Sequence, residues 1–250
     1  MSESILEGVG ESLRAVVLDL DDTLFDTSGT LVGPANRDAA AAMIGAGLPG
    51  TLEAVAQRRL QLGRAHPSED ADALVLRSFG MEEREEIARA GRTAYYSRTI
   101  RSIDPFPETM DVLDGLRGVL DLFLLTIGAP ATQQRKIDLL GIEEYFREVV
   151  IVDIAGGDKF EALVGLADRH GLPPAEVVVV GDRIDREIEA ARRLGMWAVR
   201  MAHGEGKHLL PIGPSQQPHY TIDRLAGLPY VLVDIAETGE FPRHADRDPV

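Results

Sequence analysis

Five apolar runs, separated by stretches with helical spacing, constrain the fold of this chain most strongly. Each run is almost entirely apolar, which is typical of strands buried on both faces of a parallel sheet. The runs occupy residues 15–20, 119–126, 149–153, 177–181 and 196–201. Helical patterns follow three of them, at residues 132–141, 159–171 and 184–195. This alternation of strand and helix predicts an α/β fold built on a parallel sheet.

The first two runs are too far apart for one crossover helix, since the interval between them is about 90 residues long. It also carries helical periodicity of its own, in TLEAVAQRRLQLG and MEEREEIARAGRTAYYSR. We therefore expect an all-helical domain at residues 27–105, inserted into a sheet domain formed by residues 1–26 and 106–250. The segment DPFP at 104–107 marks the return to the sheet. Residues 220–239 are expected to add an edge strand and a covering helix.

The composition excludes several classes of function. Because the chain has no cysteine, disulfides, thiolate metal sites and cysteine nucleophiles are excluded. The net charge of −15 argues against nucleic acid as a partner, since such binding depends on Lys and Arg that contact phosphates. No apolar run approaches the roughly 18 residues of a membrane span, and the acidic N-terminus does not resemble a secretory signal. We therefore expect a cytoplasmic protein without a membrane partner.

Two carboxylates, Asp19 and Asp21, stand at the end of the first apolar run. In parallel α/β sheets ligands bind beyond the carboxyl ends of the strands, which is where both residues fall. Side chains alternate along a strand, so Asp19 and Asp21 share one side while Leu20 faces the core. A divalent cation would keep one carboxylate ionised and leave the other free to carry a proton. One Asp could then attack phosphorus while the other transfers a proton, although Asp is also common at strand ends as a turn or cap residue.

Polar residues also follow the other predicted strands. Thr126 ends the second run, and Lys159 follows the third after a short loop. The fourth run leads into Asp182, with Asp185 and Glu187 behind it. Oxygen ligands of this kind suit Mg²⁺, which is usually held by one or two carboxylates together with substrate phosphate. Taken singly, the threonine is also an ordinary strand residue and the lysine an ordinary surface residue.

Together these segments resemble the four motifs of the haloacid dehalogenase (HAD) superfamily: DLDDT at 19–23, Thr126, Lys159 and GDRIDRE at 181–187. The resemblance covers nearly the whole chain and implies a Rossmann-like doubly wound parallel sheet with an inserted helical cap of the C1 type. It implies that Asp19 is the nucleophile, that Asp21 is the general acid and base, and that Thr126 and Lys159 bind the phosphoryl group. It also implies a Mg²⁺ site formed by Asp19, Asp182 and the backbone carbonyl of Asp21.

The function implied by the resemblance is a Mg²⁺-dependent phosphatase that hydrolyses a small phosphorylated metabolite through an aspartyl-phosphate. Dehalogenases of the family work without metal and lack the second Asp, so Asp21 and Asp182 favour phosphoryl transfer. A phosphomutase or phosphotransferase of the same superfamily stays open, as does a non-catalytic binding protein that keeps the fold. The chain departs from the commonest family pattern at Ile127, where Asn is frequent, and at Glu187, where Asp is frequent. Substrate identity and oligomeric state stay open.

Overall fold

The computed structural model describes residues 3–66, 69–97, 99–153 and 156–239. The chain divides into two compact units, Met1–Asp26 with Ser102–Val250, and Thr27–Arg101. Ile103, which is buried, belongs to the first unit. Within the described ranges, no helix has the length and apolar character needed to cross a lipid bilayer.

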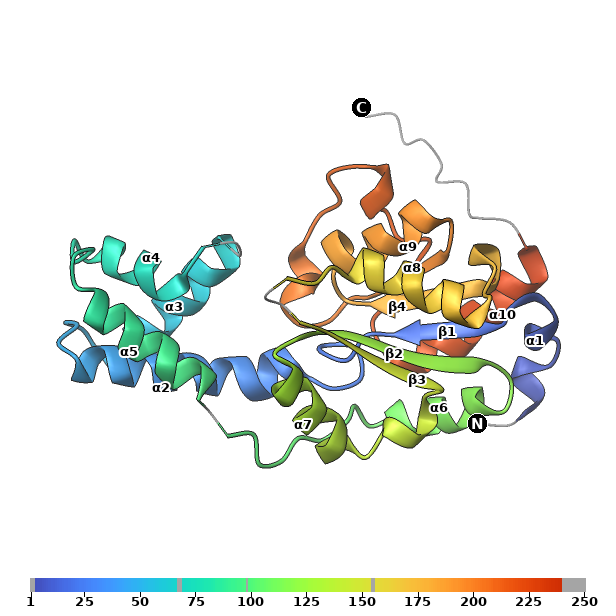
Figure 1. The fold of residues 1–250 in the computed structure, drawn as a ribbon, viewed down its shortest axis with the longest axis horizontal. Coiled ribbons are helices and arrows are strands. Elements are labelled where there is room, and N and C mark those ends of the chain that lie inside the picture. The colour runs from blue at the N-terminus through green and yellow to red at the C-terminus, as the bar shows by residue number, and fades with distance from the viewer. Residues whose placement is uncertain (1–2, 67–68, 98, 154–155, 240–250) are drawn as a thin grey trace. The chain divides into compact units, whose positions relative to one another are not determined.

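Six parallel strands form the sheet of the first unit (Figure 1). They are β1 Ala15–Leu18, β2 Asp121–Gly128, β3 Glu148–Asp153, β4 Val177–Gly181, β5 Trp197–Met201 and β6 Tyr220–Ile222. The strand order is β3-β2-β1-β4-β5-β6, and every neighbouring pair is parallel. The chain order reverses at β1, and ligands of open α/β sheets bind at such a switch point. The predicted Rossmann-like α/β fold is confirmed, and β6 is the expected edge strand.

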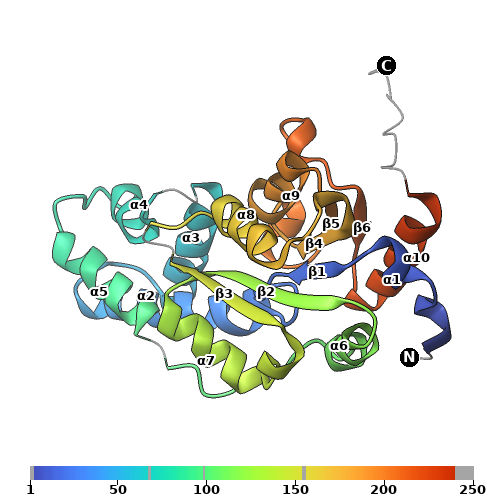
Figure 2. The ribbon, with the colours of Figure 1, turned by 45° about the vertical axis from the view of Figure 1, so that its right-hand side comes forward.

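Helices cover both faces of this sheet (Figures 1 and 2). On one face lie α8 Lys159–His170 and α9 Glu189–Leu194, and on the other lie α6 Thr109–Arg117 and α7 Pro130–Leu140. Helix α10 Leu228–Thr238 packs with α6 and with α1 Val9–Ser12. Short helical turns are η1 Glu3–Leu6, η3 Glu143–Tyr145, η4 Pro174–Glu176, η5 Ile184–Ile188, η6 Glu205–His208, η7 Pro214–Gln216 and η8 Leu225–Gly227. The helix expected at 184–195 therefore begins as the π-helical turn η5.

The apolar runs pack as their composition predicts. Val17 of β1 lies in register with Phe123 of β2, and both join Leu163 of α8 and Ile188 of η5 in one buried apolar cluster. Truncating one such side chain to Ala typically costs about 2–5 kcal/mol. This closely packed platform fixes the strand ends, and with them the polar residues that follow.

The second unit is helical. It consists of η2 Ser28–Val32, α2 Gly33–Gly45, α3 Leu52–Ala65, α4 Ala71–Ser78 and α5 Glu85–Tyr96. Each of the four α-helices contributes a fully buried side chain to its apolar core, namely Met43, Val55, Val75 and Ile87. Helix α3 begins with a cap in which the hydroxyl of Thr51 accepts a hydrogen bond from the N–H of Ala54 at 3.3 Å.

An ion pair is buried inside the second unit. Arg59 donates from Nε to Asp72 Oδ1 and from Nη2 to Asp72 Oδ2, both at 2.9 Å. Its Nη1 donates to Asn36 Oδ1 at 2.8 Å, and its guanidinium lies 4.2 Å from the centre of the Tyr95 ring. Gly91 makes room for the carboxylate, because a Cβ there would lie 2.2 Å from Asp72 Oδ1. The guanidinium and the carboxylate neutralise each other, and their hydrogen bonds are made within the unit.

Candidate active site

Asp19 is the first residue after β1. Its N–H donates to the carbonyl of Val180 in β4 at 2.9 Å, which continues the sheet one residue beyond the strand. Asp19 is 5% exposed, and Leu20 is fully buried in the core as predicted. The sheet therefore fixes the backbone of Asp19 at the switch point and leaves its carboxylate little contact with water.

Lys159 lies between two carboxylates. It opens α8, where the side chain of Asp158 caps the helix by accepting a hydrogen bond from the N–H of Phe160 at 2.9 Å. Lys159 Nζ donates to Asp19 Oδ1 at 2.6 Å and also to Glu187 Oε1. The side chains of all three residues are almost completely buried. The lysine expected after the third strand thus directs its ammonium group at Asp19.

Asp182 and Glu187 come from the segment after β4. Glu187 Oε2 accepts a hydrogen bond from the N–H of Arg183 at 3.1 Å, so the turn itself orients this carboxylate. Asp185 instead pairs with the guanidinium of Arg183 at 2.8 Å, and its side chain is 41% exposed. Carboxylate oxygens of Asp19, Asp182 and Glu187 all lie within 4.8 Å of one another. Of the two acidic residues that follow Asp182 in the last motif, Glu187 joins the cluster and Asp185 does not.

Burial and mutual repulsion change the protonation of this cluster. Burial raises the pKa of the Asp19 carboxyl to about 7, and the charge of Glu187 adds to the rise while Lys159 opposes it. Burial likewise raises the pKa of Asp182 to about 9, with further contributions from Glu187 and Asp19. Burial alone would lower the pKa of Lys159, but Asp19 and Glu187 outweigh it and hold the pKa above its ordinary value. The ammonium is therefore charged at neutral pH, whereas the raised pKa values of Asp19 and Asp182 mean that these carboxyl groups bind protons when no cation is present.

The donor set of this cluster fits Mg²⁺. Three buried carboxylates face one ammonium, so the excess negative charge has to be met by protons or by a cation. All donors are hard oxygens, which Mg²⁺ prefers, and a Mg²⁺ site usually needs only one or two carboxylates. The two predicted carboxylate ligands, Asp19 and Asp182, come together here, and Glu187 joins them.

The carboxylate of Asp21 is held by helix α7. Gln133 Nε2 donates to Asp21 Oδ2 at 2.8 Å, and Lys136 Nζ donates to Asp21 Oδ1 at 2.6 Å. The same nitrogen of Gln133 donates to the hydroxyl of Thr126 at 2.6 Å. Asp21 remains close enough to Asp19 for its charge to contribute to the raised pKa of that residue. Asp21 and the fully buried Thr126 therefore form a second group beside the first.

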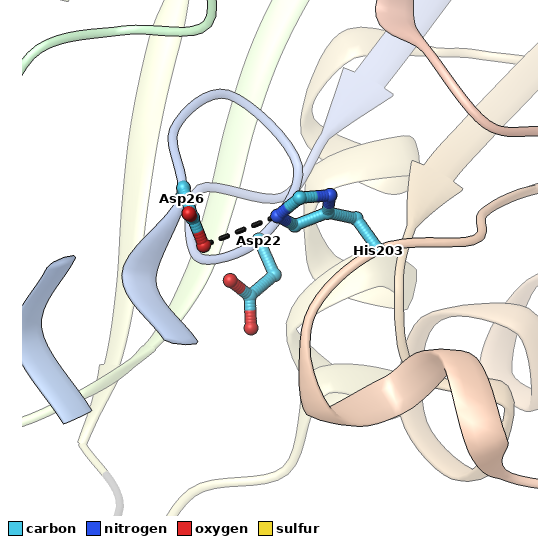
Figure 3. Close-up of side chains that lie close together, drawn as sticks. All are labelled: Asp22, Asp26 and His203. Atoms are coloured by element: carbon cyan, nitrogen blue, oxygen red, sulfur yellow. Dashed lines mark hydrogen bonds and ion pairs between the residues drawn. The ribbon is translucent and has the colours of Figure 1, made fainter. Parts of the chain in front are cut away.

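The loop after β5 contacts the segment that contains Asp22 and Asp26, which follows Asp19 and Asp21 in the chain (Figure 3). His203 Nε2 lies 3.1 Å from Asp26 Oδ1, and Asp22 lies beside the pair. Gly204, with φ at +59°, approaches Asp22 so closely that a Cβ would lie 2.1 Å from Asp22 Oδ2. This loop is therefore closely packed against the end of the first motif.

Comparisons with known proteins give the family. Residues 13–195 match the haloacid dehalogenase-like hydrolases. The chain belongs to this family. It is 34% identical over 234 residues to the glyceraldehyde 3-phosphate phosphatase of Methanopyrus kandleri, covering 90% of this chain and 99% of that protein. It is 25% identical over 260 residues to the N-acylneuraminate-9-phosphatase of Mus musculus, covering 89% and 95%. Its fold is similar to that of the HAD-hydrolase YfnB from Bacillus subtilis bound to magnesium, with a TM-score of 0.64, 19% identity and coverage of 88% and 98%.

Family membership confirms the resemblance drawn from the four motifs, and with it the predicted enzyme class of HAD-like hydrolase. The predicted site residues of this hydrolase fall into two groups at the carboxyl ends of the strands. Asp19, Lys159 and Asp182 lie in the first, and Asp21 and Thr126 lie in the second.

Two residues of the HAD-like site, Gln133 and Lys136, are not singled out by the sequence. The signal that could have found them is their spacing, because residues three apart lie on one face of a helix and this helix follows Thr126. The rarity of lysine adds to it, since Lys136 is one of only three lysines in the chain. Neither feature of the sequence shows which acidic residue this face of the helix contacts.

Proposed function

We propose that this HAD-like hydrolase is a Mg²⁺-dependent phosphatase that acts on a small phosphorylated metabolite through an aspartyl-phosphate on Asp19. The observation that carries the proposal is the buried carboxylate of Asp19, 2.6 Å from Lys159 Nζ, within a cluster whose carboxylates outnumber its ammonium group. A carboxylate in this setting has a fixed direction and little hydration, which suits a nucleophile. The roles of the residues follow from their positions around it.

In the first step, a carboxylate oxygen of Asp19 attacks phosphorus, and the bond from phosphorus to the leaving oxygen breaks. Asp21, protonated at this stage, gives its proton to that oxygen, so the leaving group departs as a neutral alcohol. Lys159 stabilises the negative charge shared by Asp19 and the phosphoryl oxygens. The hydroxyl of Thr126 accepts from Gln133, which leaves its own proton to be donated to a phosphoryl oxygen.

In the second step, water attacks the phosphorus of the aspartyl-phosphate. Asp21, ionised by the first step, takes a proton from this water, and the bond from phosphorus to Asp19 breaks. Inorganic phosphate leaves, and both aspartates return to their starting protonation states. Proton transfer of this kind typically contributes about 10²–10⁴ to the rate.

The carboxylates of Asp19 and Asp182 and the backbone carbonyl of Asp21 are the groups that would hold Mg²⁺, while Glu187 holds Lys159 beside them. When bound, Mg²⁺ supplies positive charge that polarises the phosphoryl group and offsets the charge of the carboxylates. The oxygen-only donor set supports this assignment, as does the magnesium bound to YfnB, which has a similar fold.

The substrate class we propose is that of glyceraldehyde 3-phosphate and similar small phosphate esters. Five curated relatives share the name glyceraldehyde 3-phosphate phosphatase, and the Methanopyrus kandleri protein matches over nearly its full length. We also propose that the helical unit Thr27–Arg101 serves as the cap domain that limits the leaving group, and that the reaction takes place in the cytoplasm.

The test is phosphate release from a panel of phosphate esters that includes glyceraldehyde 3-phosphate, glycerol phosphate and N-acylneuraminate 9-phosphate. Each is assayed with Mg²⁺ and with EDTA, and the Asp19→Asn protein serves as the blank. We expect Mg²⁺-dependent release that is strongest for one chemical class. Absence of release above the blank, from folded protein that binds Mg²⁺, contradicts the proposal. Conversion of one phosphate isomer into another without net release would instead identify a phosphomutase.

A further inference from the structure

Both oxygens of Asp21 are held by side chains of one helix, α7, at 2.6 Å from Lys136 and 2.8 Å from Gln133. The acceptors around Gln133 fix the orientation of its amide. Its Nε2 faces the carboxylate of Asp21, the hydroxyl of Thr126 and, at 3.3 Å, the carbonyl oxygen of Ile127. The carbonyl oxygen of Ile127 only accepts hydrogen bonds, so the nitrogen of the amide has to be the atom that faces it.

The two donors are themselves buried and immobile. Gln133 is 2% exposed and Lys136 is 7% exposed. A buried ammonium needs a partner, because leaving it without one is costly, and the partner of Lys136 is Asp21. The ring of Phe25 adds a second contact, with its centre 5.8 Å from Lys136 Nζ. The ammonium is therefore held against Asp21 rather than moving freely in solvent.

The backbone is shaped to admit this arrangement. A Cβ at Gly128 would lie 2.9 Å from both Cγ and Cδ of Gln133, so the glycine lets that side chain pass the end of β2. Gln133 also lies in the first turn of α7, where its N–H donates to the carbonyl of Ala129 at 3.0 Å. An isolated bridge between Asp21 and Phe25 fixes the backbone on the other side. The network thus joins the ends of β1 and β2 through α7.

We propose that Gln133 and Lys136 are positioning residues that set the rotamer of Asp21 and tie it to Thr126. This inference rests on the proposed function, because it takes Asp21 as the acid and base of the reaction. The two protons of the Gln133 amide are shared among three acceptors, whereas Lys136 binds Oδ1 as a charged donor at 2.6 Å, so Asp21 is held more firmly at Oδ1 than at Oδ2. Lys136 holds Oδ1, and Oδ2 is the oxygen that faces the leaving group in the first step and water in the second.

Substrates with different leaving groups should respond differently to the loss of Lys136 or Gln133. A sugar or glycerol alkoxide is a strong base and needs a proton as it leaves, whereas 4-nitrophenolate is stable without one. Loss of a group that only positions the acid should therefore slow alkyl phosphates much more than 4-nitrophenyl phosphate. Damage to the fold or to the phosphoryl site would slow both substrates alike.

The experiment compares wild type with Lys136→Met and Gln133→Met on 4-nitrophenyl phosphate and on the best alkyl phosphate of the panel. The matched controls are Arg135→Met and Gln134→Met, on the same helix, where Arg135 is exposed and Gln134 pairs with Asp138. For Lys136→Met we expect kcat on the alkyl ester to fall about 10- to 100-fold, within the range of general acid catalysis, and kcat on the aryl ester to fall less than about 3-fold. KM should change little on either ester. Gln133→Met should show the same selective loss together with a higher KM, because Thr126 also loses its partner. The controls should match wild type.

The outcomes test the positioning role of Gln133 and Lys136 separately from the proposed phosphatase activity. Equal losses on both esters, or no loss on either, would contradict the inference while wild-type activity leaves the proposed function standing. Absence of release by wild type would contradict the function and the inference together. If thermal unfolding shows that Lys136→Met does not fold, Gln133→Met is used instead, and the loss of kcat on the alkyl ester is again compared with the loss on the aryl ester.

Discussion

Each unit of this hydrolase buries charged side chains, and the two groups differ in their balance of charge. In the helical unit one guanidinium, Arg59, meets one carboxylate, Asp72, through two hydrogen bonds. In the sheet unit one ammonium, Lys159, bonds Asp19 and Glu187, and Asp182 lies within 4.8 Å of both carboxylates. The first group is neutral, whereas the second carries a surplus of negative charge when its carboxylates are ionised.

The difference separates a structural group from a functional one. A neutral, fully hydrogen-bonded pair can be retained for the shape it gives the helices around it. A surplus of buried carboxylates lowers the stability of the protein unless something else binds, and perturbed carboxylates of this kind are typical of catalytic and metal sites.

Asp19→Asn should abolish turnover. The amide is not a nucleophile towards phosphorus, and no second step can replace the covalent intermediate. Initial rates of phosphate release should fall to the level without enzyme, whereas Asp111→Asn, an exposed residue of α6, should match wild type. Full activity of a purified Asp19→Asn protein would remove the basis for treating the unbalanced cluster as catalytic.

Arg59→Met should have the largest effect on stability. It leaves Asp72 buried without its counter-charge, which typically lowers the free energy of unfolding by about 3–5 kcal/mol. The double variant Arg59→Met/Asp72→Leu should recover most of that loss, because a neutral pair is exchanged for apolar side chains. Urea unfolding followed by circular dichroism measures both, while fluorescence of Trp197, the single tryptophan, reports on the sheet unit. A double variant as unstable as the single one would show that the pair is not a self-contained structural group.

Stability of the metal-free protein should fall as pH rises. The folded-state pKa values of Asp19 and Asp182, about 7 and about 9, lie above the ordinary value of 3.8, so between these limits the folded state binds more protons than the unfolded state. The free energy of unfolding should therefore decrease from about pH 5 to about pH 9, by roughly 2 kcal/mol or more. Mg²⁺ should reduce this slope, because it stabilises the ionised carboxylates. Urea midpoints in EDTA that rise over this interval would contradict the assignment.

Arg37→Ala should have the smallest effect. Arg37 Nη1 lies 2.8 Å from Glu53 Oε2, but both side chains are more than half exposed. Exposed pairs of this kind contribute at most about 1 kcal/mol, so the urea midpoint should move little. A loss as large as that of Arg59→Met would mean that burial is not what distinguishes the two ion pairs.

The sequence predicts the ends of the third, fourth and fifth strands at residues 153, 181 and 201, because polar or loop residues follow these apolar runs. The first strand ends earlier than predicted, at Leu18, and β2 continues to Gly128, so Thr126 lies inside the strand rather than at its end. The second strand is shifted, since Val119 and Leu120 donate their N–H groups to Leu116 and finish the turn after α6 instead of starting β2. An apolar run does not show which of its residues belong to the preceding turn.

The part of the site that lies within motifs could be predicted, and the part that depends on packing between elements could not. Asp185 and Glu187 are equally acidic in the sequence, and only the π-helical turn decides that Glu187 meets Lys159. Gln133 and Lys136 lie on a helix whose angle to the sheet is set by the apolar core. Which acid they contact therefore depends on tertiary structure.

The central claim is that Asp19 forms a covalent bond to phosphorus. The most direct measurement is mass spectrometry of acid-quenched Asp21→Asn protein after incubation with Mg²⁺ and 4-nitrophenyl phosphate. This variant lacks the base that activates water to hydrolyse the aspartyl-phosphate. The first step still takes place, because the 4-nitrophenolate of the substrate leaves without an acid. We predict one added phosphoryl group on the peptide that contains Asp19, sensitive to hydroxylamine and absent in EDTA and in the Asp19→Asn/Asp21→Asn protein. Phosphate release by the wild type without any phosphoryl group on that peptide, or with the group on another residue, would contradict the account.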